Sequence, residues 1–227
     1  MNILVPTPPV AGAEVAEASK LVSASLRVAR AVADLRAGKG VIVTDSEDRE
    51  NEGDFVFSAE NLTIEQMALM IREGSGIVCL VISDARALQL ELPPMVQDNQ
   101  SKFGTGFTVS IEARHGVSSG VSAADRVRTI QAAVAIDAEA NDLVRPGHVF
   151  PLKSHPEGLH GRQGHTEATL ELMRLAGLRD AGVLCEITNP DGTMARGDDL
   201  DRSATRNGMV IVSISDILVV IGECGQF

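Results

Sequence analysis

The sequence of 227 residues contains no Trp, no Tyr and only six Phe. Single-stranded nucleic acids are commonly held by stacking their bases on aromatic side chains, so this scarcity argues against that class of protein. The formal net charge is −11 and the Lys and Arg residues are scattered, so no basic stripe is available to a nucleic-acid backbone. We expect no nucleic-acid partner, and a phosphate ester would need local help from arginines, helix N-termini or a cation.

Cysteine is also scarce, and a long apolar run is missing. Cys79, Cys185 and Cys224 show no CxxC spacing, and the first two lie in the apolar runs GIVCLVI and GVLCEIT. This pattern indicates core thiols in a reducing cytosol, so we expect a cytoplasmic protein. The N-terminus lacks the features of a signal peptide, and MVIVSISDILVVIG is too short to cross a bilayer. We therefore expect no membrane partner.

Apolar periodicity and turn residues predict the elements. A helix is predicted from Leu21 to Arg36, and residues 1–20, rich in Pro, Ala and Gly, are expected to form a flexible segment outside the core. The other predictions are strands at 40–44, 76–82, 104–113, 182–188 and 209–214, helices at 64–73, 123–136 and 166–176, and short helices after residue 83 and before residue 209. Strands and helices alternate, which predicts a single layered α/β domain over residues 21–227, with a twisted sheet flanked by helices.

Three helix starts carry capping signals. Thr63 with Gln66, and Ser122 with Asp125, have the spacing of a capping box. Thr166 is expected to stand at the start of the third long helix.

The most unusual stretch is DSEDRENEGD, residues 45–54, which crowds six carboxylates around Arg49 directly after a predicted strand. If its second half stays extended, Glu50, Glu52 and Asp54 project to one side. Three carboxylates on one side suit a hard divalent cation such as Mg²⁺. A solvated acidic loop explains the pattern equally well.

A second candidate is HGVSSGVSAAD, residues 115–125, where a Gly/Ser-rich turn leads into a predicted helix. The free N–H groups of a helix start favour an anion, and Ser118 and Ser119 could add hydroxyl donors. Pattern alone favours an ordinary loop with a Ser122 cap. The segment is not a P-loop, because no Gly-Lys-Ser or Gly-Lys-Thr follows.

A third candidate is GRQGHTEAT, residues 161–169, at another predicted helix start. Arg162 offers a bidentate fork to a phosphate. The positive helix end disfavours a charged imidazole, so His165 could be neutral and free to ligate a metal. A surface histidine beside a capping Thr166 is an equal alternative.

Two single residues break their local pattern. His148 lies between a Pro-Gly turn and an apolar run, and Glu186 interrupts the apolar strand GVLCEIT. A carboxylate buried there must either pair structurally or act as a base with a raised pKa.

Taken together, DSEDRENEGD, GTGFTV, GVSSGVSAADR, RPGHVFPL, GHTEAT and GVLCEITNPDGTMAR resemble the motifs of the 3,4-dihydroxy-2-butanone 4-phosphate synthase family, in the same order from about Leu26 to Ile217. The resemblance implies conversion of D-ribulose 5-phosphate into formate and L-3,4-dihydroxy-2-butanone 4-phosphate, a step of riboflavin biosynthesis. It further implies Mg²⁺ or Mn²⁺ as cofactor, a mixed sheet, and a homodimer whose active sites lie near the subunit interface.

The resemblance also assigns roles by position. Glu50 and His165 match metal ligands, and His148 and Glu186 match essential acid–base groups. The positions that match substrate contacts are Arg49, Glu50, Asp54, Ser119, Arg162, Gln163, Gly164, His165, Thr166 and Glu186. In this interpretation the metal stabilises an enediolate as a Lewis acid, while Asp54, His148 and Glu186 move protons.

Two departures from the family pattern are visible. Ser118 and Ser119 replace expected threonines, and Phe103 replaces a common tyrosine. No cysteine cluster suits the zinc of a fused GTP cyclohydrolase II domain, so we expect none. A pentose phosphate isomerase and a non-catalytic sugar-phosphate sensor are the alternative functions.

Overall fold

The structure, a computed structural model, describes the backbone of residues 11–224 and the side chains of residues 19–222. Its strands are β1 Val41–Thr44, β2 Gly53–Ser58, β3 Cys79–Ile82, β4 Ile111–Ala113, β5 Leu143–Lys153, β6 Ala181–Glu186 and β7 Val210–Ser213. Its helices are α1 Ala11–Arg36, α2 Ile64–Glu73, α3 Asp84–Gln89, α4 Ala123–Val134, η1 Ala140–Asp142, α5 Gly158–Gly161, α6 His165–Leu175, α7 Asp198–Asn207 and α8 Ile214–Cys224.

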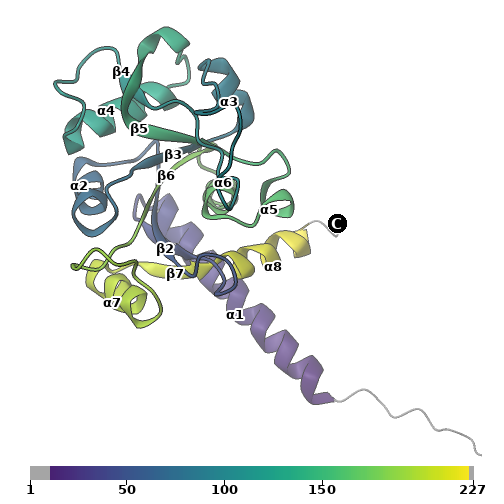
Figure 1. The fold of residues 1–227 in the computed structure, drawn as a ribbon. Helices are drawn as coiled ribbons and strands as arrows, with labels where there is room; N and C mark the ends of the chain where they lie inside the picture. The colour runs from purple at the N-terminus through teal and green to yellow at the C-terminus, as the bar shows by residue number, and fades with distance from the viewer. Residues whose placement is uncertain (1–10, 225–227) are drawn as a thin grey trace, which may run out of the picture.

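The strands form one seven-stranded sheet in the order β4-β5-β3-β6-β2-β1-β7 (Figure 1). β1 pairs with β7, and β3 with β5, in parallel, whereas the other neighbours are antiparallel. The sheet is therefore mixed, and helices lie on both of its faces. The predicted layered α/β class is confirmed.

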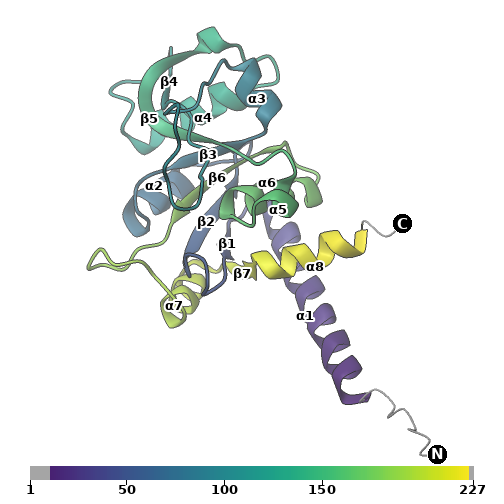
Figure 2. The same ribbon diagram turned by 45° about the vertical axis from the view of Figure 1, so that its right-hand side comes forward.

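Alternation along the strands divides the core between the two faces. In β1, Val41 and Val43 pack with α1, α6 and α8, whereas Ile42 packs on the opposite face, towards α2 and α7. Figure 2 shows α1, α6 and α8 close to one another on their side of the sheet. Each fully buried aliphatic or Phe side chain contributes about 1.5–3 kcal/mol. Burial on both faces of the sheet thus fixes which side chains of each strand face which layer of helices.

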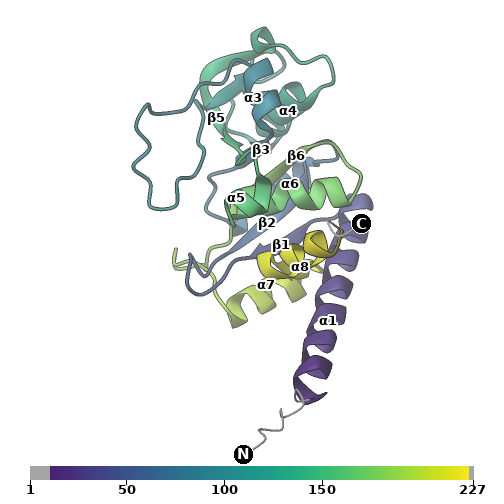
Figure 3. The ribbon, with the colours of Figure 1, turned by 90° about the vertical axis from the view of Figure 1, so that its right-hand side faces the viewer.

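The structure differs from several predicted boundaries. α1 begins at Ala11, ten residues before the predicted start, and residues 1–10 lie outside the described residues. The predicted strand 104–113 is a strand only at Ile111–Ala113, with isolated bridges at Phe107 and Thr108. The connection between α3 and β4 instead projects from the body of the molecule (Figure 3). Strands β2 and β5 and helix α8 were not predicted from the sequence.

The capping predictions have mixed outcomes. Thr63 and Gln66 form the full box, with both hydrogen bonds present. Ser122 accepts the N–H of Asp125, but the carboxylate of Asp125 turns away and accepts bonds from Ser118 and Gly120. At α6 the N-cap residue is Gly164, so the prediction of Thr166 as the first residue of the helix is wrong by one position.

Within the described part of the chain, no helix combines the length and the apolar character needed to cross a membrane.

Candidate active site

The acidic stretch and the start of α6 meet in a cleft of about 100 Å³, where β2 begins and its antiparallel neighbour β6 ends. The cleft is lined by Arg49, Glu50, Glu52, Asp54, Cys79, Thr105, Phe107, Leu152, Arg162, His165, Thr166, Leu184 and Glu186. A larger cavity of about 710 Å³ lies under residues 94–108 and shares Thr105 and Phe107 with this cleft. The charged groups that can do chemistry gather in the smaller one.

The acidic stretch is held in its shape by Asp45, a residue that sequence reasoning did not single out. Residues 47–50 form a turn and Asn51 has a φ of 55°, so the extended conformation begins only at β2. The carboxylate of Asp45 accepts the backbone N–H groups of Glu50 and Glu52, both at 2.9 Å. This local arrangement directs Glu50 into the cleft. The signal in the sequence is an Asp directly after a buried strand.

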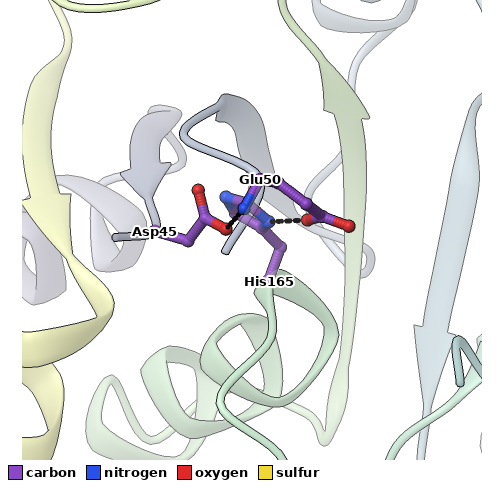
Figure 4. Close-up of side chains that lie close together, drawn as sticks. All are labelled: Asp45, Glu50 and His165. Carbon is purple, nitrogen blue, oxygen red and sulfur yellow. Dashed lines mark hydrogen bonds and ion pairs between the residues drawn. The ribbon is translucent and has the colours of Figure 1, made fainter. Parts of the chain in front are cut away.

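The Glu50 carboxylate lies against His165 of α6. Its Oε2 is 3.5 Å from His165 Nδ1, and it also contacts the guanidinium of Arg49. Figure 4 shows His165 pointing from the first turn of α6 towards Asp45 and Glu50. One ligand atom from each of these three residues lies within 4.8 Å of the others. The group is thus compact enough to surround a cation.

Two buried polar atoms in the cleft lack hydrogen-bond partners within the described part of the chain. Asp54 Oδ1 and His165 Nε2 are both buried, and neither has a partner among the side chains that the structure describes. They lie 4.0 Å apart. Buried polar atoms without partners are uncommon and costly, and they indicate a group that an ion, water or substrate satisfies. The donor set of carboxylates and one imidazole fits Mg²⁺ or Mn²⁺.

Burial and charge strongly perturb the titration of this cleft. Burial raises the pKa of Asp54 to about 7, opposed by the nearby His165 and assisted by Glu186 and Glu50. Burial alone would lower the pKa of His165, but the surrounding carboxylates, above all Asp54 and Glu50, outweigh it and raise that pKa to about 9. Perturbed titrating groups gathered in a cleft are typical of an active site.

Glu186 lies beside this group at the end of β6. It is the register partner of Asp54 across the β2–β6 pair, and its Oε2 accepts a hydrogen bond of 2.7 Å from Ser75. The carboxylate therefore enters the cleft with one oxygen already oriented. The pattern break in the sequence is explained by a position at the mouth of the cleft rather than in the core.

Arg162 links the cleft to the segment between α3 and β4. Its Nε donates to the carbonyl of Phe103 and its Nη2 to Thr105 Oγ1, both at 3.0 Å, while Nη1 pairs with the buried Glu167 at 2.7 Å. The ring of Phe103 in turn lies 4.8 Å from the guanidinium carbon of Arg49. Arg162 thus braces the cleft wall as well as lining the cleft.

The start of α6 has the features of an anion site. Its N-cap, Gly164, offers no side-chain cap, so the N–H groups of the first turn remain available. A Cβ at Gly164 would collide with the guanidinium of Arg162, which therefore lies directly over the helix start. Thr166 is buried in the first turn, and Gln163 is exposed.

Two of the predicted site residues lie elsewhere in the described chain. Gln163 and Gly164 do not line the cleft either, but they are chain neighbours of Arg162 and His165, which do, whereas His148 on β5 and Ser119 in the loop before α4 belong to other elements. His148 Nδ1 instead pairs with Glu112 Oε2 at 2.6 Å. Ser119 is exposed, next to Ser118, whose hydroxyl donates to Asp125. These residues belong to the part of the molecule built from β4, β5 and α4.

Comparisons with known proteins agree with this geometry. A sequence profile described as 3,4-dihydroxy-2-butanone 4-phosphate synthase matches residues 29–220. A relative of that name from Rhodospirillum rubrum is 63% identical over 198 residues, which cover 87% of this chain and 92% of the relative. One from Shewanella loihica is 61% identical over 192 residues, covering 85% and 88%. A crystal structure of a 3,4-dihydroxy-2-butanone 4-phosphate synthase in complex with two magnesium ions has a TM-score of 0.83 and 37% identity, covering 86% of this chain and 96% of that one.

Proposed function

Because the chain belongs to the 3,4-dihydroxy-2-butanone 4-phosphate synthase family, and is thus a lyase of riboflavin biosynthesis, we propose that its reaction takes place in the acidic cleft. This reaction converts D-ribulose 5-phosphate into L-3,4-dihydroxy-2-butanone 4-phosphate and formate. The observation that carries the proposal is the convergence of Glu50, Asp54, His165 and Glu186 on one buried cleft. Free Cys79 and Cys185 support a cytoplasmic location.

Glu50 and His165 are the proposed ligands of a divalent cation, Mg²⁺ or Mn²⁺. Asp45 is close enough to join them, but its oxygens already accept two backbone N–H groups and a bond from Arg49. Its role is to hold the loop that presents Glu50. When bound, the cation supplies Lewis acidity to vicinal oxygens of a sugar. His165 must lose its proton to become a ligand, so cation binding should release protons near neutral pH.

Asp54 and Glu186 are the proposed proton carriers within the chain. A buried carboxyl whose pKa is about 7 can both accept and return a proton at the pH of a cell. Glu186, adjacent across the strand pair, is half-buried and held by Ser75. Two carboxyl groups with different environments can exchange protons with different atoms of one substrate.

The phosphate of the substrate is proposed to bind at the start of α6, over Gly164 and beside Arg162. Arg162→Ala removes a charge-assisted bond, about 1.5–3 kcal/mol, so KM for ribulose 5-phosphate should rise about ten- to a hundredfold. Steady-state kinetics measures this, with inorganic phosphate as competitor. Arg174→Ala, on the exposed end of the same helix, is the control. An unchanged KM in Arg162→Ala would contradict the assignment.

A homodimer is proposed because His148 and Ser119 lie outside the cleft of their own chain. In this arrangement a second subunit supplies both residues, and each site combines His165 of one chain with His148 of the other. Co-expression of His165→Ala with His148→Ala chains then creates mixed dimers that contain one intact site. Random pairing should restore roughly a quarter of wild-type activity, whereas either variant alone should keep only the residual activity left after loss of one essential group, about a hundredth or less. Failure of the mixture to exceed the separate variants would exclude a shared site.

Formate production tests the proposed reaction as a whole. Purified protein with ribulose 5-phosphate and Mg²⁺ should release one formate per sugar consumed, and EDTA should stop the release. An isomerase or epimerase would consume the sugar without releasing formate. A sugar-phosphate sensor would show ligand-induced thermal stabilisation with no turnover.

A further inference from the structure

The His148–Glu112 pair is built into a distortion of the sheet edge. Ile111 is the register partner of Val149, but the next residue, Glu112, is the partner of Val144, so β5 bulges between these two positions. His148 lies on the bulge, and 46% of its side chain is exposed. Bulges commonly redirect a side chain near a functional site. Here the bulge brings the imidazole to the surface while leaving Nδ1 2.6 Å from Glu112 Oε2.

Glu112 is far more rigidly held than a surface carboxylate. It is only 8% exposed, and its Oε1 lies 3.1 Å from Thr129 Oγ1, whose single hydrogen is shared between Glu112 and the Asp125 carbonyl at 3.0 Å. Thr129 is fully buried and also accepts the N–H of Ala113. A Cβ at Gly120, whose φ is +81°, would collide with the Glu112 carboxylate, so the backbone of that loop packs directly on it. A side chain fixed from two sides can fix its partner in turn.

We propose that Glu112 is a positioning residue for His148: it holds the hydrogen of the neutral imidazole on Nδ1 and leaves Nε2 free to exchange a proton with substrate. The inference rests on the proposed role of His148 in the cleft of a second subunit. Its physical basis is that an ionised carboxylate only accepts hydrogen bonds, so the nitrogen that faces it must carry the hydrogen. No bond to His148 Nε2 occurs among the described residues.

Hydrogen bonds also hold the loop of Ser119, the other predicted residue that lies outside the cleft. The Asp125 carboxylate accepts the N–H of Gly120 at 3.1 Å and both the N–H and the hydroxyl of Ser118. The loop that carries Ser119 is thereby anchored to the backbone that packs on Glu112. His148 and Ser119 are thus presented from one hydrogen-bonded platform, which suits two groups that must reach the same substrate.

A purely structural salt bridge would share this geometry, so the test must separate the two roles. The holoenzyme with Mg²⁺ is compared as wild type, Glu112→Ala, His148→Ala and the double variant. If Glu112 acts through His148, Glu112→Ala lowers kcat by on the order of a hundredfold with KM changed less than about threefold. In the His148→Ala background the same substitution should then cost less than about twofold. Losses that multiply in the double variant would overturn the inference.

Nitrogen NMR of ¹⁵N-histidine-labelled protein reads the tautomer directly, with the His148 signal assigned by its absence in His148→Ala. At a pH where the imidazole is neutral, wild type should carry the hydrogen on Nδ1, and Glu112→Ala should shift the population towards Nε2. Across wild type, Glu112→Gln and Glu112→Ala, kcat should follow the Nδ1–H fraction. A fall in kcat without a tautomer change would overturn the inference, and Glu112→Gln keeps the test available if the alanine variant does not fold. Full activity of His148→Ala alone would instead refute the proposed role of His148.

Discussion

His165→Ala is expected to remove divalent-cation binding and turnover together while leaving the fold intact. Among the described residues, His165 is the one imidazole that the chain contributes to its own cleft, and Glu50 lies 3.5 Å from its Nδ1. Loss of a Lewis acid that stabilises developing charge by about 4 kcal/mol corresponds to a fall in kcat of roughly a thousandfold. Calorimetric titration of Mn²⁺ into the substrate-free protein measures the binding loss without reference to activity.

His160→Ala is the matched control for this substitution, because His160 is an exposed histidine on α5, just before α6. It should keep wild-type cation affinity and kcat. Glu50→Ala should reproduce the His165→Ala result, since both ligands serve the same ion. Near-full turnover or unchanged Mn²⁺ affinity in either variant would show that the cation is held elsewhere.

Short apolar runs predicted much of the central sheet, because a strand that is buried on both faces has apolar residues at nearly every position. β1, β3 and β7 lie within predicted strands, and β6 overlaps the strand predicted at 182–188 but begins one residue earlier, at Ala181. β5 was missed because Pro146 and Gly147 are typical of a turn, whereas here they lie in the bulge between Val144 and Val149. β2 was missed because it follows directly on charged residues. Whether segments such as β2 and β5 form strands depends on which neighbouring strand they pair with, and local sequence patterns do not reveal that pairing.

The candidate site, too, could be predicted only in part from the sequence. Local patterns identified the acidic loop and the start of α6 as candidates, each beside an equally good ordinary explanation. Their proximity was implied by family resemblance, since nothing in their spacing brings Glu50 to His165. Asp45 was overlooked because its function is to bind the backbone of its own loop, which only the folded turn reveals. The separation of His148 from the cleft likewise depends on tertiary structure.

Glu186→Gln is expected to lower kcat by about a hundred- to ten-thousandfold, the range for loss of a general acid or base, with cation affinity unchanged. The amide keeps the size of the side chain and can still accept the Ser75 hydrogen bond. Glu186 is also outside the compact group of Asp45, Glu50 and His165. Stopped assays of formate release and Mn²⁺ titration of the same preparation separate the two effects.

The control must remove a charge from the cleft without removing a proposed proton carrier, and Glu52 allows this. Glu52 lines the same cleft, pairs with Arg196 at 3.3 Å and, like Glu186, helps raise the pKa of Asp54. Burial is the main cause of that raised pKa, so either glutamine variant should shift the titration of Asp54 only partly towards lower pH. If Glu186 transfers protons, Glu52→Gln should retain most of kcat while Glu186→Gln does not. Equal losses in the two variants would mean that the cleft needs the negative charge of Glu186 and not its proton, because charge is the one property that the two substitutions remove in common.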